Sequence, residues 1–250
     1  MHPLPTVLAA AYGAVAGLLL PRPLYRLSVQ PEEPWRGACP RGHRLPGSAR
    51  GWLGAAWCRE CAAGPAGSGA YGVRAPLAAA VTALVCAGLA AAVGARPELA
   101  VWALLAPPGL LLAAVDRAVH RLPDVLTLPM AGGTAALLGV GALLPGHAGS
   151  WPRALLGGVA LGGAYFLLFV VSPGGMGFGD VKLALALGVA LGWYGWGVLV
   201  AGACAGVLLG GCWAVVLMAT RRAGRRSPMA YGPFMIVGAG AGLVLGGLGA

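Results

Sequence analysis

Eight apolar runs divide this sequence, and each is about long enough to cross the hydrocarbon core of a bilayer, which is about 30 Å thick. The runs lie at about residues 4–20, 76–94, 97–115, 124–143, 154–172, 181–195, 196–219 and 229–249. Hydrophobic residues make up 58% of the chain and charged residues only 10%, so a water-soluble domain of ordinary surface composition is excluded. The sequence therefore predicts an all-α, polytopic membrane protein with about eight transmembrane helices.

The positive charges predict how these helices are oriented, because cytoplasmic loops are enriched in Lys and Arg. With the N-terminus outside, all of the 17 Lys and Arg residues except Arg96 and Arg153 fall on the cytoplasmic side. No basic residue precedes the first run, so we expect it to stay in the protein as a helix and not to be cleaved as a signal peptide. The charges alternate with the spans and form no aromatic-interleaved stripe, so nucleic acid is not expected as a partner.

Three regions follow from the spacing of the runs. Residues 1–21 form the first transmembrane helix, residues 22–75 a cytoplasmic loop, and residues 76–250 a core of seven helices. The loop is rich in Arg, Gly and Pro and shows neither helical nor strand periodicity. A segment of this length cannot bury a core of its own, so it needs a staple or a partner.

Two aspartates lie at the ends of apolar runs, where ionisable groups are costly and usually functional. Asp116 closes the third run, and Asp180 opens the sixth, directly after Gly177-Phe178-Gly179. The sixth run has only about twelve apolar residues before Trp193 and Tyr194, which we expect at the far membrane interface. Both aspartates fall on the cytoplasmic side in this topology, so the fold can bring them together.

Two carboxylates in contact share one proton, because neighbouring like charges cannot both ionise. The ionised member can take a proton from water that attacks a peptide carbonyl, and the protonated member can hydrogen-bond the carbonyl oxygen. The pair therefore predicts an aspartyl protease, in which the flanking glycines allow positive φ angles and let a substrate backbone approach Asp180. The alternative is that Asp116 and Asp180 only cap helices or pair with Arg117 and Lys182. We expect Asp124, after Pro123, to be a structural helix cap.

Three motifs carry a resemblance to a known family. Residues 175–183 read Gly-Met-Gly-Phe-Gly-Asp-Val-Lys-Leu and resemble the G-x-G-D-x-K signature of the prepilin peptidases, or type IV leader peptidases, which are intramembrane aspartyl proteases. Asp116 with residues 121–129, Arg-Leu-Pro-Asp-Val-Leu-Thr-Leu-Pro, resembles the family's first aspartate motif. Residues 231–234, Tyr-Gly-Pro-Phe, resemble its G-P-F segment. The resemblance covers nearly the whole chain.

The resemblance implies an endopeptidase of the bacterial inner membrane. Its substrates would be type IV prepilin-like proteins, whose basic leader is cleaved at the cytoplasmic face, and its surroundings would be membrane lipids. Asp116 and Asp180 would be the catalytic residues, and Gly177, Gly179 and Lys182 would belong to the active-site loop.

Four metal-ligating residues fall within the loop as C-x3-H-x14-C-x2-C: Cys39, His43, Cys58 and Cys61. Four soft ligands at this spacing can form a tetrahedral zinc site, which would supply the staple. Many family members carry two C-x-x-C pairs here, and His43 must replace one cysteine. The alternative is three reduced thiols and a solvated histidine. Cysteines within the spans, Cys86, Cys204 and Cys212, are expected to be small packing residues.

A second activity stays open at this point. Many family members also methylate the new N-terminus with S-adenosylmethionine, an activity associated with the cysteine-bearing loop. Here the loop lacks one family cysteine, and the Asn expected near the end of the first span is not evident in residues 17–22. Two other classes compete with the peptidase: a transporter or proton relay using the membrane carboxylates, and a non-catalytic membrane scaffold with a zinc knuckle.

Overall fold

The computed structural model describes residues 3–64, 67–172, 176–221 and 229–250. Each apolar run forms one long helix, because a backbone in hydrocarbon must satisfy its hydrogen bonds within the segment. These helices are α1 (Pro3–Leu19), α5 (Ala75–Val93), α6 (Glu98–Val119), α7 (Asp124–Gly141), α8 (Trp151–Val171), α9 (Phe178–Tyr194), α10 (Trp196–Ala219) and α11 (Gly232–Gly249). Within these described ranges no β-strand is present, so the all-α prediction is confirmed.

The polytopic prediction is also confirmed, although the helices differ in how well they suit a crossing. Six of them, α5, α6, α7, α8, α10 and α11, are long and apolar enough to span a membrane. Helix α1 forms a bent pair with α2 (Pro21–Leu27), at an angle of 44°, that counts as a seventh candidate if it is one broken span. Helix α9 has 17 residues, which is at the lower limit of a crossing.

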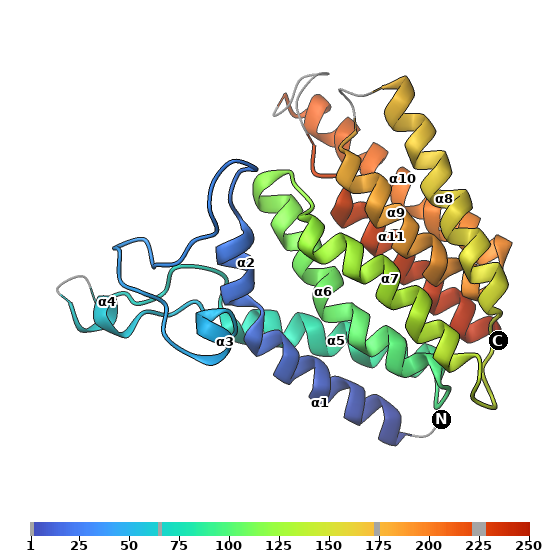
Figure 1. Ribbon diagram of the computed structural model, residues 1–250, viewed down its shortest axis with the longest axis horizontal. Helices are drawn as coiled ribbons and strands as arrows, with labels where there is room; N and C mark the ends of the chain where they lie inside the picture. The colour runs from blue at the N-terminus through green and yellow to red at the C-terminus, as the bar shows by residue number, and fades with distance from the viewer. Residues whose placement is uncertain (1–2, 65–66, 173–175, 222–228) are drawn as a thin grey trace.

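Helix α9 lies in the middle of the bundle and is enclosed by protein (Figure 1). It packs against α7, α8, α10 and α11, while α1 packs along α5 and α6 lies between α5 and α7. Twelve of its 17 residues are buried. Trp193 is among them and is fully buried, so it does not face lipid headgroups as a residue of an aromatic belt would. The following Tyr194 accepts a hydrogen bond from the indole of Trp102, 3.0 Å away.

Helices α8 and α9 pack closely, backbone against backbone. A Cβ atom added to Gly188 would lie 2.5 Å from the carbonyl oxygen of Gly157, and one added to Gly157 would lie 2.6 Å from the carbonyl oxygen of Gly188. Small residues allow helix backbones to approach this closely in lipid, where close packing drives association. Among the cysteines in the spans, Cys86 is buried as expected, but Cys204 and Cys212 are exposed on α10, so they are not packing residues.

The loop between α2 and α5 is tied down by arginine side chains. It contains α3 (Ser48–Gly51), a single turn, α4 (Arg59–Ala63) and two isolated β-bridges. Arg22 donates to the carbonyl oxygens of Pro46 and Ala55. Arg26 donates to the Arg50 carbonyl oxygen at 3.3 Å and stacks on the Trp52 ring. The carbonyl groups of Pro46 and Ala55 lie outside the helices. The arginine side chain therefore supplies hydrogen bonds that a helix or sheet would otherwise supply.

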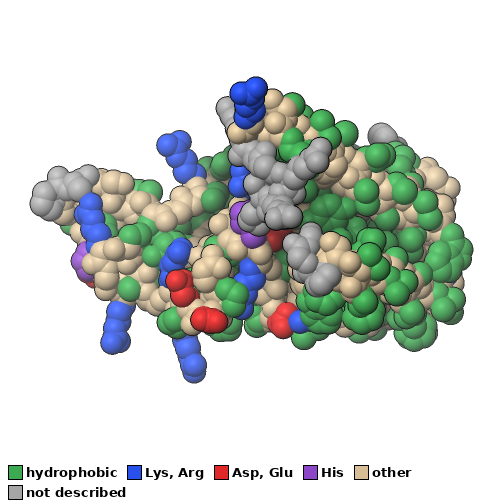
Figure 2. Space-filling model, turned by 90° about the horizontal axis from the view of Figure 1, so that it is seen from above, with side chains coloured by type: hydrophobic (Ala, Val, Ile, Leu, Met, Phe, Trp, Pro, Cys, Tyr) green, Lys and Arg blue, Asp and Glu red, His purple; other side chains and the backbone are tan. Residues whose placement is uncertain are grey.

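We name the bundle end beside this loop the loop end. There Arg121, in the α6–α7 turn, donates to the carbonyl oxygen of Val29, and the first turns of α9 and α11 meet Leu122 of the same turn. In Figure 2 the charged side chains gather over the loop and the adjoining bundle end, and hydrophobic side chains cover the rest of that face. Arg222, Arg225 and Arg226 lie outside the described residues.

Candidate active site and metal centre

Asp116 lies in the last turn of α6, at the loop end. The helix ends when His120 adopts a left-handed conformation and its N–H donates to the Asp116 carbonyl oxygen at 2.7 Å. The Asp116 side chain is only 4% exposed. Its Oδ2 atom accepts a hydrogen bond of 2.9 Å from the backbone N–H of Gly232, the first residue of α11. A backbone donor 116 residues away thus holds this carboxylate in place.

Asp180 lies in the first turn of α9 and is 7% exposed. Its Oδ2 atom accepts a hydrogen bond of 3.1 Å from the N–H of Gly177, the residue that precedes the helix. This is half of a capping box, in which a carboxylate at the third helical position satisfies an amide that the helix leaves unpaired. Each buried aspartate therefore accepts a hydrogen bond from a glycine N–H, and that hydrogen bond occupies one carboxylate oxygen.

The structure brings the two aspartates together at one site. Leu122 joins the three chain segments around them, because Cβ atoms added to Gly179 and Gly232 would lie 2.9 Å and 3.3 Å from its side chain. Helix α6 therefore ends, and α9 and α11 begin, around a single apolar side chain.

Lys182 and Arg117, the charged residues closest to the two aspartates in the sequence, form no salt bridge with them in the described part of the chain. Lys182 forms a salt bridge of 2.7 Å with Asp124 at the start of α7, and its ammonium group lies 5.0 Å from the Phe178 ring centroid. Arg117 is exposed. Asp124 makes no capping hydrogen bond, since the cap position is Pro123, so the expected cap is wrong and a salt bridge takes its place.

Neither glycine before Asp180 has a positive φ angle, and close packing requires a glycine only at position 179. Gly177 has an extended backbone, with φ −79° and ψ 146°, and neither Gly177 nor Gly179 is among the residues with positive φ. Gly179 is required by its approach to Leu122, as described above. Gly175, the first glycine of the motif, lies outside the described residues.

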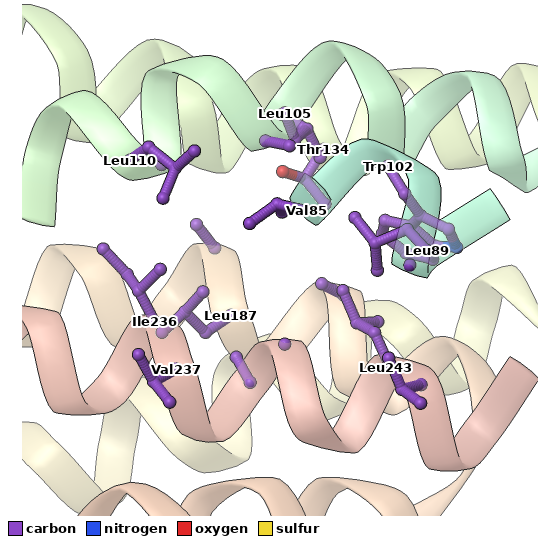
Figure 3. Close-up of a pocket in the computed structure, with 18 of the residues that line it drawn as sticks. Val85, Leu89, Trp102, Leu105, Leu110, Thr134, Leu187, Ile236, Val237 and Leu243 are labelled. Carbon is purple, nitrogen blue, oxygen red and sulfur yellow. The ribbon is translucent and has the colours of Figure 1, made fainter. Parts of the chain in front are cut away.

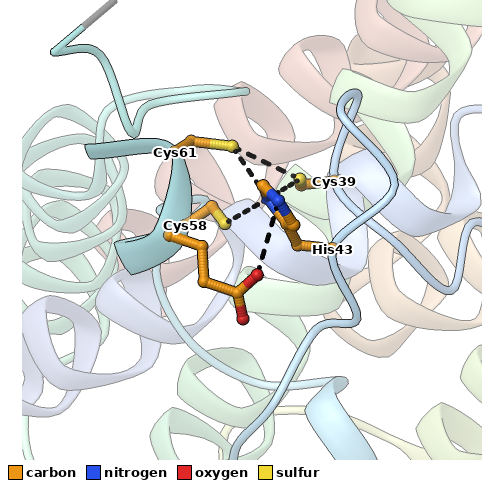
Figure 4. Close-up of polar contacts among 5 residues, drawn as sticks. Cys39, His43, Cys58 and Cys61 are labelled. Carbon is orange, nitrogen blue, oxygen red and sulfur yellow. Dashed lines mark hydrogen bonds and ion pairs between the residues drawn. The ribbon is translucent and has the colours of Figure 1, made fainter. Parts of the chain in front are cut away.

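The four predicted metal ligands converge in the loop (Figure 4). Cys39 and His43 flank a tight turn in which the Gly42 N–H donates to the Cys39 carbonyl oxygen at 2.9 Å. Cys58 precedes α4, and Cys61 lies within it. One donor atom from each of the four residues lies within 4.8 Å of all the others, and the three cysteines are buried.

These distances fit one tetrahedral ion. Bonds of about 2.3 Å to sulfur and about 2.0 Å to nitrogen place tetrahedral ligand atoms about 3.5–3.8 Å apart. The Cys39 and Cys61 sulfurs are 3.6 Å apart, and the His43 Nδ1 atom lies 3.6, 3.5 and 3.3 Å from the sulfurs of Cys39, Cys58 and Cys61. The residues present therefore fit a metal ion.

The thiols of the cluster differ in acidity. Burial opposes ionisation of Cys39, but the N–H groups of Arg41 and His43 and the thiols of Cys61 and Cys58 outweigh it and lower the pKa of Cys39 to about 6. Burial, followed by the thiols and charges of Cys58 and Cys39, raises the pKa of Cys61 to about 11. One thiolate is stabilised by the protein, and further thiolates beside it need a positive ion.

Two further residues belong to these sites and were not predicted from the sequence: Glu60 at the metal site and Gly232 beside Asp116. The Glu60 carboxylate lies 3.4 Å from Nε2 of His43, so it can orient the imidazole whose Nδ1 faces the sulfurs. Its position inside Cys58-Arg59-Glu60-Cys61 was the available signal. Gly232 belongs to the Tyr-Gly-Pro-Phe motif, but a local motif does not tell which distant side chain its N–H reaches.

Comparison with known proteins adds independent information. Residues 99–220, which include both aspartates, match the family described as "Type IV leader peptidase family". The prepilin leader peptidase/N-methyltransferase of Pseudomonas aeruginosa PAO1 is 32% identical over 219 residues, covering 80% of this chain and 68% of the relative. That of Burkholderia pseudomallei K96243 is 33% identical over 232 residues, covering 84% of this chain and 67% of the relative. No solved structure matches the chain.

Proposed function

This chain belongs to the type IV leader peptidase family, and we propose that it is a membrane aspartyl endopeptidase that cleaves the basic leader from type IV prepilin-like proteins. The observation that carries the proposal is the pair of buried aspartates at the loop end, each held by a glycine N–H. The relatives are named as peptidases, so they give no support to the transporter or proton-relay alternative.

The geometry supports a shared-proton mechanism. The ionised carboxylate removes a proton from a water molecule as its oxygen bonds to the scissile carbonyl carbon, while the protonated carboxyl hydrogen-bonds the carbonyl oxygen. When the tetrahedral intermediate collapses, the C–N bond breaks and the leaving amine takes a proton from the carboxyl that the water protonated. Gly232 and Gly177 each bind one oxygen of their aspartate, so the other oxygen is available for water and substrate.

We further propose that the loop end faces the cytoplasm of the bacterial inner membrane, with the N-terminus outside. The charge distribution supports this, because only Arg96 and Arg153 would then lie on the outer side. Arg96 donates to the Gly247 carbonyl oxygen, and Arg153 to the Trp193 carbonyl oxygen, both at the opposite end of the bundle. Prepilin-like substrates would then meet the dyad from the cytoplasmic side, and lipids would surround the helices.

In this proposal the metal is zinc, held by Cys39, His43, Cys58 and Cys61. A closed set of four protein ligands is typical of a structural site, and zinc would there hold together a loop with few helices of its own. The relatives are also named as N-methyltransferases. A methyltransferase activity in this chain would use S-adenosylmethionine. The mass of the product N-terminus, with or without one added methyl group, tests that second activity directly.

A cleavage assay on a membrane-embedded prepilin tests the peptidase. We expect Asp116→Asn and Asp180→Asn each to reduce the rate by at least about 10²-fold, because each removes a partner in proton transfer. Asp124→Asn is the matched control: it changes an aspartate that is largely exposed and paired with Lys182, so substantial activity should remain. Cleavage close to the wild-type rate in either of the first two variants would rule out the dyad.

A further inference from the structure

An apolar groove runs along α6 toward the dyad, between α5 and α11. Its first part is a cavity of about 350 Å³ that extends from Trp102 and Leu243 to Leu110 and Ile236 (Figure 3). Its second part is a cavity of about 360 Å³ that shares Leu110 and continues along α6 to Arg117. We call the two cavities together the α6 groove. From Trp102 to Arg117 it follows fifteen helical residues, a length of about 22 Å.

The lining of the groove selects an apolar occupant. Its side chains are hydrophobic except for Thr134, Thr82 and, at the loop end, Arg117. The Thr134 hydroxyl donates to the Met130 carbonyl oxygen at 2.6 Å, and the Thr82 hydroxyl to that of Ala78 at 2.8 Å. Both threonine hydroxyls are thus already used within their own helices, so the groove offers little to a polar ligand.

The groove opens sideways, on the surface that faces lipid. Leu77 and Leu84 on α5 are 59% and 72% exposed, and Val237 on α11 is 58% exposed. At the end away from the dyad, α5 and α11 meet and close the groove. A Cβ atom added to Gly247 of α11 would lie 3.1 Å from the backbone of Ala92 of α5. An occupant can therefore enter from the bilayer and lie along α6, but it cannot pass beyond the closed end.

The open end of the groove lies beside residues that neighbour Asp116 and its partner Gly232 in the sequence. Pro233 lines the second cavity, and it directly follows Gly232, whose N–H binds the Asp116 carboxylate. On α6, Ala113 and Arg117 line the same cavity on either side of Asp116 in the sequence. A segment lying in the groove would thus bring the peptide bond at its end next to Asp116.

Resting on the proposed peptidase activity, we propose that the α6 groove receives an apolar helical segment of the substrate that adjoins the scissile bond. Each cavity has room for a few apolar side chains but not for a whole helix, so one face of the segment docks and its other face remains in lipid. The groove is about 22 Å long and ends at Arg117 and Pro233, next to Asp116 and Gly232 in the sequence, which matches a helix that places its terminus near the active site. Binding of a lipid acyl chain would not require the groove to end near the active site.

Leucine substitutions at open glycines test the proposal. Cβ atoms added to Gly88 of α5 and Gly240 of α11 would meet nothing within 4 Å, so Gly88→Leu and Gly240→Leu fill the groove without a clash. The controls are Gly163→Leu on α8 and Gly211→Leu on α10, which are equally open but lie outside the groove. Each variant is assayed with a full-length prepilin and with a short peptide that holds the cleavage site but lacks the apolar segment.

We expect the groove variants to raise KM for the full-length prepilin by roughly tenfold or more and to leave kcat/KM for the short peptide unchanged. The control variants should match the wild type on both substrates. Unchanged KM for the full-length substrate, or an equal loss on both substrates, would overturn the docking site. If the wild type cleaves neither substrate, the proposed peptidase activity itself has failed, which is a different result.

A binding measurement keeps the proposal testable if a leucine variant does not fold. A photoreactive amino acid replaces Val237 on the rim of the groove in the Asp180→Asn protein, and Val207 on α10, also exposed, is the matched control position. Full-length prepilin should crosslink through position 237 and not through position 207. Adducts with lipid alone at position 237 would show that the groove binds acyl chains and would overturn the proposal.

Discussion

At the scale of single residues, position 232 requires a glycine because a side chain would crowd the Asp116 carboxylate. A Cβ atom there would lie 2.9 Å from the Asp116 Oδ2 atom that its own N–H binds. We expect Gly232→Ala to displace the carboxylate and lower kcat by roughly tenfold or more, since small misplacements of catalytic groups are costly. Gly211→Ala, at an open glycine on α10, is the control. A Gly232→Ala protein with wild-type kcat would show that the contact is dispensable.

Glu98 is a buried carboxylate far from the dyad, and it secures the opposite end of the bundle. It is fully buried, and its Oε1 atom accepts the N–H of Ala148 in the α7–α8 connection at 3.2 Å. Glu98→Ala leaves that amide without its partner, so the free energy of unfolding should fall by about 1–3 kcal/mol. Glu98→Gln keeps an acceptor and should lose less. Thermal unfolding of the purified protein measures both, and equal midpoints for Glu98→Ala and wild type would contradict this role.

The sequence predicted the two aspartates because acidic residues are rare in this chain and these two stand beside apolar runs. It did not predict what holds them. The Gly232 N–H and the Lys182–Asp124 pair join residues 116 and 58 positions apart. Such contacts depend on how helices pack, and no local pattern encodes them. Gly177 and Gly179 do not use positive φ angles, and at Gly179 it is close packing against Leu122 that requires a glycine.

At the scale of elements, the proposed zinc site would hold the loop between α2 and α5 together. We expect the purified protein to contain about one zinc ion, bound by the four-ligand cluster. Cys58→Ser should release the ion and unfold the loop, because the ion joins two otherwise separate turns. Elemental analysis measures the metal, and limited proteolysis between α2 and α5 measures the unfolding.

The controls for the metal prediction come from the other cysteines. Cys204→Ser and Cys212→Ser change exposed thiols on α10 and should keep the zinc and the protease resistance of the wild type. Protein purified without chelators that contains no zinc would refute the prediction. Glu60→Gln should retain the ion but weaken its binding, since Glu60 orients His43 without contacting the metal.

Hydropathy located the long helices well, because each one must satisfy its backbone within the bilayer. It could not locate α2 and α4, which are too short to carry a periodic signal and form only because the rest of the loop packs on them. It also placed Trp193 at an interface, because aromatic belts are common there. A neighbouring loop covers this residue instead: a Cβ atom on Gly149 would lie 2.3 Å from its ring.

At the scale of the whole molecule, the proposed orientation can be measured by thiol labelling. Leu143, in the α7–α8 connection, is 83% exposed, and Leu53, in the loop between α2 and α5, is 39% exposed. A membrane-impermeant thiol reagent should label Leu143→Cys in cells whose inner membrane is intact. It should label Leu53→Cys only after that membrane is disrupted. The wild type gives the background from native cysteines, and the reverse pattern would place the N-terminus inside.

The enclosure of α9 has a consequence for how the cell makes this protein. With 17 residues, Asp180 in its first turn and Lys182 two residues later, α9 gains little by entering the bilayer alone. Helix α8 leaves the ribosome just before it and offers a matching backbone surface at Gly157. We therefore expect the insertion machinery to release the two as a helical hairpin, in which the preceding helix carries the second carboxylate of the dyad into the membrane.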